Sequence, residues 1–222
     1  MRNYKRITVL CGHYGSGKTN VAVNMAFDLK KQRENVALAD LDIVNPYFRA
    51  KDSMDELKVA GIRFIGSPYA NSNVDIPALP QDMYAITDDR SLWCVLDIGG
   101  DDRGALALGR IAPAILKEND YEMLMVINSA RPLTRDVVST IEVMREIEAA
   151  GGIRFTGLVN NTNLGSETTA QDVLASLPYA KEVSALSGLP IVATSVREDL
   201  MPELDGNVEN LFPLRLQKHE NL

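Results

Sequence analysis

The sequence predicts a three-layer α/β fold, in which a mostly parallel sheet is flanked by helices on both faces. Short runs that are apolar throughout recur along the chain, and stretches with apolar residues at helical spacing separate them. Strands of that kind are buried on both faces, as in parallel sheets covered by helices. A glycine-rich turn joins the first apolar run to the first helical stretch. Because the chain has 222 residues, we expect a single domain over residues 1–222.

Each apolar run is predicted to be a strand because it has the length of one and ends at polar or turn-forming residues. These runs are residues 7–11, 36–39, 62–65, 92–96, 123–127, 155–159 and 191–194. The stretches predicted to be helices are residues 18 to about 33, 105–117, 134–150 and 168–186. In the first of these stretches, Ala22, Met25 and Leu29 share one helix face, which we expect to be buried. Residues 68–81 contain three prolines and little periodicity, so they predict a long surface loop.

Composition narrows the classes of protein to consider. The formal net charge is −7, which argues against a dedicated nucleic-acid binder. Cys11 and Cys94 lie inside apolar runs, and we expect both to be reduced core residues. No apolar run approaches the roughly 20 residues that a membrane-spanning helix needs. We therefore expect a cytoplasmic protein that binds neither nucleic acid nor a membrane.

The glycine-rich turn matches the phosphate-binding pattern G-x-x-x-x-G-K-[ST] between a predicted strand and a predicted helix. Glycines let backbone N–H groups point at phosphates, and the helix N-terminus adds partial positive charge. Lys18 is expected to reach the β- and γ-phosphates, and the Thr19 hydroxyl to bind Mg²⁺. The residues expected to bind the nucleotide here are Gly12, Tyr14, Gly15, Ser16, Gly17, Lys18, Thr19 and Asn20.

Acidic residues follow two of the predicted strands. Asp40 and Asp42 come after residues 36–39, and Asp97 comes after residues 92–96. In open parallel sheets the ligand lies beyond the carboxyl ends of the strands, so these acids should face the phosphate-binding loop. We expect Asp97 to anchor Mg²⁺. Asp40 and Asp42 are candidates for orienting the attacking water or the metal.

Together these residues resemble the ParA/MinD/nitrogenase-iron-protein group of ATPases, also called the CobQ/CobB/MinD/ParA nucleotide-binding domain. Asp40-x-Asp42 resembles the second acidic motif of that group, and residues 97–101 are similar to its D-x-x-G-D switch. Residues 157–161 resemble the strand whose terminal asparagine contacts adenine, which implies that role for Asn161. The resemblance covers nearly the whole chain and implies ATP and Mg²⁺ as ligands, with a protein client.

The chain departs from the group at one position of the loop. The group usually has G-K-G-G-x-G-K-T, in which the first lysine reaches the phosphates of a dimer partner. His13 stands at that position, and Tyr14 replaces the next glycine. ATP binding should persist through Lys18, whereas a nucleotide-dependent homodimer stays open. We expect a slow ATPase that acts as a switch on a partner protein.

Three alternatives remain at this stage. A GTP-dependent metallochaperone has a similar loop, but residues 160–163 contain neither the lysine nor the aspartate of a guanine-recognition motif. A dethiobiotin- or cobyrinate-type ligase has the same fold, yet we identify no substrate pocket for it. The third alternative is a non-enzymatic or membrane-cycling role, because residues 211–218 weakly resemble an amphipathic membrane anchor; the competing interpretation of this segment is a tail packed on the body. Residues 45–49 and 68–81 are candidates for the surface that meets a client.

Overall fold

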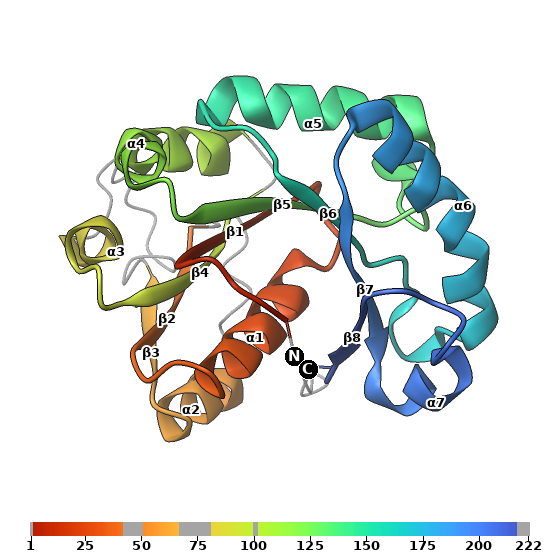
Figure 1. The fold of residues 1–222 in the computed structure, drawn as a ribbon, viewed down its shortest axis with the longest axis horizontal. Coiled ribbons are helices and arrows are strands. Elements are labelled where there is room, and N and C mark those ends of the chain that lie inside the picture. Colours follow the sequence, from red (N-terminus) through yellow and green to blue (C-terminus); the bar gives the residue numbers. More distant parts are fainter. Residues whose placement is uncertain (1, 42–50, 67–80, 100–101, 217–222) are drawn as a thin grey trace.

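A computed structural model describes residues 2–41, 51–66, 81–99 and 102–216 of the chain (Figure 1). Its centre is one sheet in the order β3-β2-β4-β1-β5-β6-β7-β8, and every pairing of neighbours is parallel. The strands are β1 (Ile7–Cys11), β2 (Val36–Asp40), β3 (Ile62–Gly66), β4 (Trp93–Asp97), β5 (Tyr121–Ile127), β6 (Gly157–Asn160), β7 (Ile191–Arg197) and β8 (Leu211–Leu214). This sheet confirms the predicted fold class.

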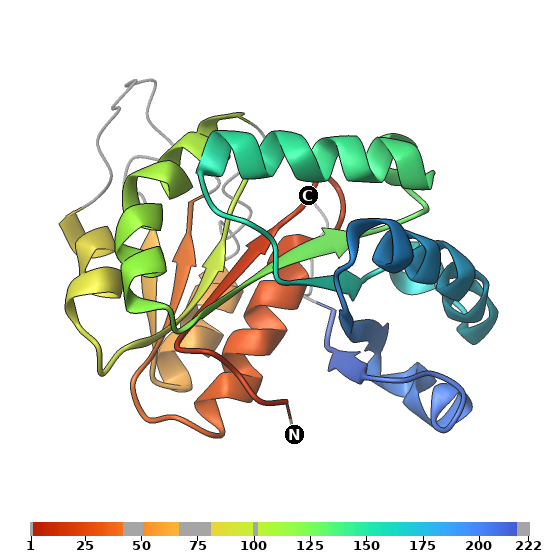
Figure 2. The ribbon, with the colours of Figure 1, turned by 45° about the horizontal axis from the view of Figure 1, so that its top comes forward.

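Helices cover both faces of the sheet, because each strand contributes side chains to two cores. The α-helices are α1 (Lys18–Lys30), α2 (Lys51–Val59), α3 (Ala85–Asp88), α4 (Asp102–Glu118), α5 (Val137–Gly151), α6 (Ala170–Ser187) and α7 (Met201–Leu204). One core contains Ile7 and Val9 of β1 with buried residues of α4, α5 and α6, and the other contains Leu10 with buried residues of α1. Figure 2 shows α4 and α5 along one side of the sheet and α1 on the other.

Helix boundaries follow capping residues more closely than apolar periodicity. The third predicted helix was expected from residue 134 but begins at Val137, because the Asp136 side chain accepts a hydrogen bond from the Ser139 N–H. Thr169 and Asp172 form a capping box that starts α6 two residues later than expected. The first helix ends at Lys30, about three residues earlier than expected. In the described part of the chain, none of the helices combines the length and apolarity needed to cross a bilayer.

The sequence did not predict α2, α3, α7 or β8. The anchor interpretation is wrong for residues 211–214, which form the edge strand β8 beside β7. Phe212 and Leu214 are buried under α1, while Pro213 between them is exposed. Proline is tolerated at a sheet edge because its missing N–H is not needed for pairing there. Residues 217 and 218 of the same segment lie outside the described residues.

Both cysteines are free thiols buried in the core, as predicted. Burial raises the pKa of the Cys94 thiol to about 12, and burial also raises the pKa of Cys11 despite the opposing effect of Lys18. Both therefore remain protonated at neutral pH and are poor nucleophiles.

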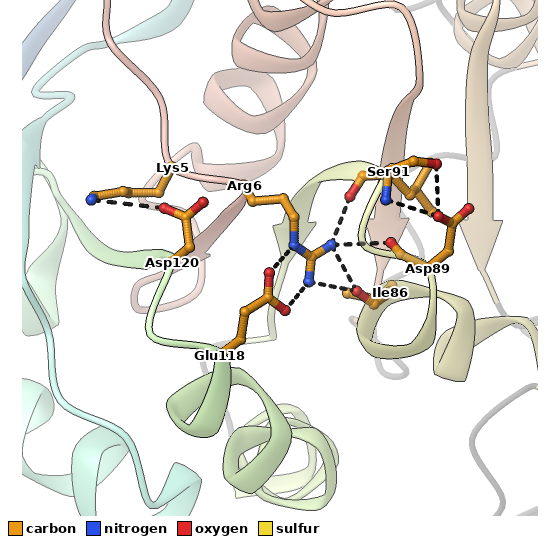
Figure 3. A network of polar contacts seen from close by, with 8 residues as sticks. Lys5, Arg6, Ile86, Asp89, Ser91, Glu118 and Asp120 are labelled. Carbon is orange, nitrogen blue, oxygen red and sulfur yellow. Dashed lines mark hydrogen bonds and ion pairs between the residues drawn. The ribbon is translucent and has the colours of Figure 1, made fainter.

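A buried ion pair closes the amino-terminal end of β1, at the opposite end of the strand from the glycine-rich turn (Figure 3). The Arg6 guanidinium is paired with the Glu118 carboxylate at the end of α4 and donates to the carbonyls of Ile86 and Leu92, at 3.0 and 2.7 Å. Arg6 is 4% exposed. The pair ties the first strand to α4 and to the segment before β4.

Replacing Arg6 with methionine should lower the free energy of unfolding by about 3–5 kcal/mol, because it leaves the Glu118 carboxylate buried without a cation. Urea denaturation measures the change. Lys5→Met is the matched control, since Lys5 pairs with Asp120 at 3.7 Å while about half exposed, and it should cost under about 1 kcal/mol. Equal losses of unfolding free energy in the two variants would show that the buried ion pair stabilises the fold no more than the exposed one.

Candidate nucleotide-binding site

The glycine-rich turn lies between β1 and α1 and has the backbone shape that phosphate binding requires. Gly15 and Gly17 have left-handed φ values of 79° and 84°, which favour glycine. Gly17 is the N-cap of α1 and has no side chain that could accept a hydrogen bond from the first turn, and a helix N-terminus carries partial positive charge that favours an anion. A Cβ on Gly12 would lie 2.5 Å from the Val126 carbonyl oxygen, so this position has room only for glycine.

The two residues predicted to hold a metal lie next to each other. The Thr19 hydroxyl donates to Oδ2 of Asp97 at 2.6 Å, which joins the first turn of α1 to the end of β4. The Asp97 side chain is 1% exposed. A hydroxyl and a carboxylate are the oxygen ligands that Mg²⁺ prefers, so this donor set fits the expected metal. Lys18, 5% exposed, precedes Thr19 in the same turn.

Asp40 lies beside Asp97 at the same edge of the sheet. It is the last residue of β2 and is in register with Asp97 of β4, on a strand about 4.8 Å away. Asp40 is partly exposed, and the next residue, Leu41, donates its N–H to the Asp97 carbonyl at 2.9 Å. Asp42 lies outside the described residues, as do Gly100 and Asp101 and the segments 45–49 and 68–80.

Asn161 lies directly behind the turn and holds it in place. Its Nδ2 donates to the Ser16 carbonyl at 2.7 Å, and its Oδ1 accepts from the Ser195 hydroxyl at 2.6 Å. The side chain is 1% exposed. The family resemblance implied a contact between Asn161 and adenine, which stays a prediction, while the hydrogen bond to Ser16 is a structural role that the sequence did not show.

The remaining predicted residues differ in exposure. Tyr14 is 65% exposed, and His13 is partly exposed, with its Nδ1 3.1 Å from the Tyr14 carbonyl oxygen. Ser16 is buried, and Asn20 is a partly exposed residue of α1 whose carbonyl accepts from Asn24. The turn therefore presents Tyr14 to the surface and keeps Ser16 inside.

One residue near the turn was missed by the sequence analysis. Arg131, in the loop after β5, donates from Nε to the Gly15 carbonyl at 2.8 Å. No local motif marks this arginine. Its contact depends on β5 pairing directly with β1, which brings the loops after the two strands together.

A phosphate-binding loop whose threonine is bonded to an acid on the adjacent parallel strand is the arrangement of a P-loop NTPase, the class that this fold and site define. The model of the CobQ/CobB/MinD/ParA nucleotide-binding domain family, CbiA, matches residues 7–191. The chain therefore belongs to this family. Comparison with curated protein sequences gives no significant match.

Several solved structures share the fold. The cell division protein FtsY of Thermotoga maritima is 18% identical with a TM-score of 0.58, and the match covers 88% of this chain and 62% of that one. Chloroplast FtsY of Physcomitrella patens is 18% identical with a TM-score of 0.57, covering 87% and 59%. The signal recognition particle receptor FtsY of Elizabethkingia anophelis is 19% identical with a TM-score of 0.55, covering 87% and 60%. The chain thus spans less than two thirds of these FtsY chains, and the identity shows a common fold alone.

Proposed function

We propose that this protein binds ATP with Mg²⁺ in the cytoplasm and hydrolyses it slowly, as a switch of the MinD/ParA type that acts on a partner protein. The observation that supports the proposal most is the hydrogen bond between Thr19 and Asp97. It joins the loop that would hold the phosphates to the acid that would anchor the metal. The same pair would serve a GTP-dependent protein of this fold, so the choice of ATP rests on the base-binding residues instead.

The residues of the site divide the chemistry among them. Backbone N–H groups of the turn and Lys18 would hold the β- and γ-phosphates, since both carry positive potential into the cradle. When bound, Mg²⁺ would neutralise charge on the β- and γ-oxygens. Asp40, in register with Asp97, would orient a water at this edge of the sheet, and Asp42, two residues further on, is the second candidate for that role.

Turnover is expected to be slow because the charge set around the γ-phosphate is incomplete. In the family, a lysine of the loop reaches the phosphates of a dimer partner, and this chain has His13 at that position. A missing cation of this kind can cost roughly 10³-fold in rate. The isolated protein should therefore hydrolyse ATP on the order of once per minute or less.

ATP should bind at least about tenfold more tightly than GTP, a difference of about 1.4 kcal/mol. The reason is that residues 160–163 contain no aspartate that could accept hydrogen bonds from the N1 and N2 donors of guanine. Calorimetry with both nucleotides, followed by single-turnover hydrolysis of each, tests the proposal. Equal affinities or a preference for GTP would favour the GTP-dependent alternative, and no binding of either would refute the proposed function.

A partner protein would meet the same edge of the sheet. Tyr14, Leu133 and Leu164 follow β1, β5 and β6, and these residues are 65%, 55% and 51% exposed. Exposed apolar residues around a nucleotide site suit a contact that depends on the bound nucleotide. Sedimentation velocity with ATP and with ADP tests whether that contact is a homodimer, and a monomer in both conditions would exclude a nucleotide-dependent homodimer.

A further inference from the structure

Arg131 lies against the phosphate-binding loop with most of its guanidinium unused. Its Nε donates to the Gly15 carbonyl at 2.8 Å, and its Cδ and Nε lie 3.6 and 3.5 Å from the position that a Cβ of Gly15 would occupy. The side chain therefore passes directly over Gly15. Within the described residues, Nη1 and Nη2 make no hydrogen bond, and the side chain is exposed. With respect to the described part of the chain, four N–H donors and a positive charge remain available for a ligand.

The loop that carries Arg131 is held rigidly by the buried Asn128. The Arg131 N–H donates to the Asn128 carbonyl at 3.1 Å, the Ala130 N–H donates to the Asn128 side chain at 3.0 Å, and the Thr134 hydroxyl donates to the Asn128 carbonyl at 2.8 Å. Pro132 follows at the start of a short 3₁₀-helix and fixes its own φ. The arginine is thus oriented before any ligand binds, which reduces the entropy that a contact would cost.

The strand order shows which end of a nucleotide Arg131 would face. Asp97 ends β4 and Arg131 follows β5, and these two strands flank β1 on opposite sides. The metal position at Thr19 and Asp97 is therefore on the β4 side of the loop. A metal held by these two residues would neutralise charge on the β- and γ-phosphates, so we place the γ-phosphate on that side. The α-phosphate and the nucleoside would extend in the other direction, over the loops after β5 and β6.

We infer that Arg131 is a nucleotide-binding residue that holds Gly15 through Nε and lays its guanidinium plane against the purine base. The inference rests on the proposed function and adds a residue that neither the loop motif nor the family resemblance assigned. A planar cation stacks well on an aromatic base, and an ammonium does so less well. Arg131 would therefore stabilise the bound nucleoside rather than the γ-phosphate.

Calorimetry with ATP, ADP and inorganic tripolyphosphate tests the inference in the full chain. Arg131→Ala should weaken the binding of ATP and of ADP by the same factor, about three- to tenfold, because both nucleotides carry the base. The affinity for tripolyphosphate, which lacks a base, should fall by less than about twofold. Arg131→Lys keeps the charge and should still weaken ATP. Arg135→Ala is the matched control, because Arg135 is an exposed arginine four residues further along the chain. The Arg135→Ala variant should bind all three ligands with the affinity of the wild type.

The outcomes separate the inference from the proposed function. A wild type that binds ATP, with an Arg131→Ala variant of unchanged affinity, overturns the inference alone. Equal losses for ATP and tripolyphosphate also overturn it, because they assign the guanidinium to the phosphates. A wild type that binds none of the three ligands overturns the proposed function, and the inference with it. Circular dichroism of each variant establishes that the fold is retained, so a change in affinity reports on the site.

Discussion

Replacing Lys18 with alanine is expected to abolish ATP binding while the fold stays intact. Lys18 is the first residue of α1, is 5% exposed, and directly follows Gly17, the last residue of the glycine-rich turn. A lysine in this position makes charge-assisted hydrogen bonds to two phosphates, each worth about 1.5–3 kcal/mol. Their loss should weaken ATP binding by about 100-fold or more. Isothermal calorimetry of wild type and variant measures the change.

The matched control for this prediction is Lys31→Ala. Lys31 caps the other end of α1 and its side chain is 69% exposed, so its removal should leave ATP affinity within about twofold of the wild type. Circular dichroism shows whether both variants keep the fold. A folded Lys18→Ala protein with the ATP affinity of the wild type would refute the assignment of the phosphate site.

Asp97→Asn should lower Mg²⁺-dependent ATP hydrolysis by about 100-fold or more. The amide has the shape of the carboxylate and can still accept the hydrogen bond of Thr19, so the core around β4 should remain packed. The amide lacks the negative charge that anchors a divalent cation. A bound metal ion stabilises the charge of such a transition state by several kcal/mol. Single-turnover hydrolysis across a range of Mg²⁺ concentrations measures the effect, which should include a higher Mg²⁺ requirement.

Asp40→Asn is the comparison that separates metal anchoring from water orientation. Asp40 is in register with Asp97 on the neighbouring strand, so both substitutions change the charge at one place. We expect Asp40→Asn to slow hydrolysis of bound ATP while the Mg²⁺ requirement stays that of the wild type. If Asp97→Asn leaves both the rate and the Mg²⁺ requirement unchanged, the metal site has been assigned to the wrong acid.

The parts of the structure that could be predicted are those encoded over a few consecutive residues. The turn between β1 and α1 is an example, because Gly15 and Gly17 adopt φ values that sterics allow mainly to glycine. The apolar runs likewise predicted seven of the strands, since burial on both faces leaves a continuous apolar pattern. Helix starts were less accurate, because caps such as Asp136 outweigh periodicity.

β8 shows where local patterns fail. Its four residues include Pro213, and their sequence is compatible both with a membrane anchor and with a packed tail. The strand forms because its backbone pairs with β7, and because Phe212 and Leu214 pack against buried residues of α1. Neither the edge nor the core can be read from residues 211–214, so their tertiary surroundings decided the outcome.

For this protein, the sequence alone determined the fold class, the phosphate-binding loop and the strand-end acids, because sterics and burial act on neighbouring residues. Only the tertiary structure showed that Asn161 holds Ser16 and that Arg131 holds Gly15, through hydrogen bonds between residues 145 and 116 positions apart. Those contacts depend on strand order, since β5 lies beside β1 and β6 beside β5. Strand order is settled by how helices and strands pack together, and side chains distant in the chain meet only once that packing exists.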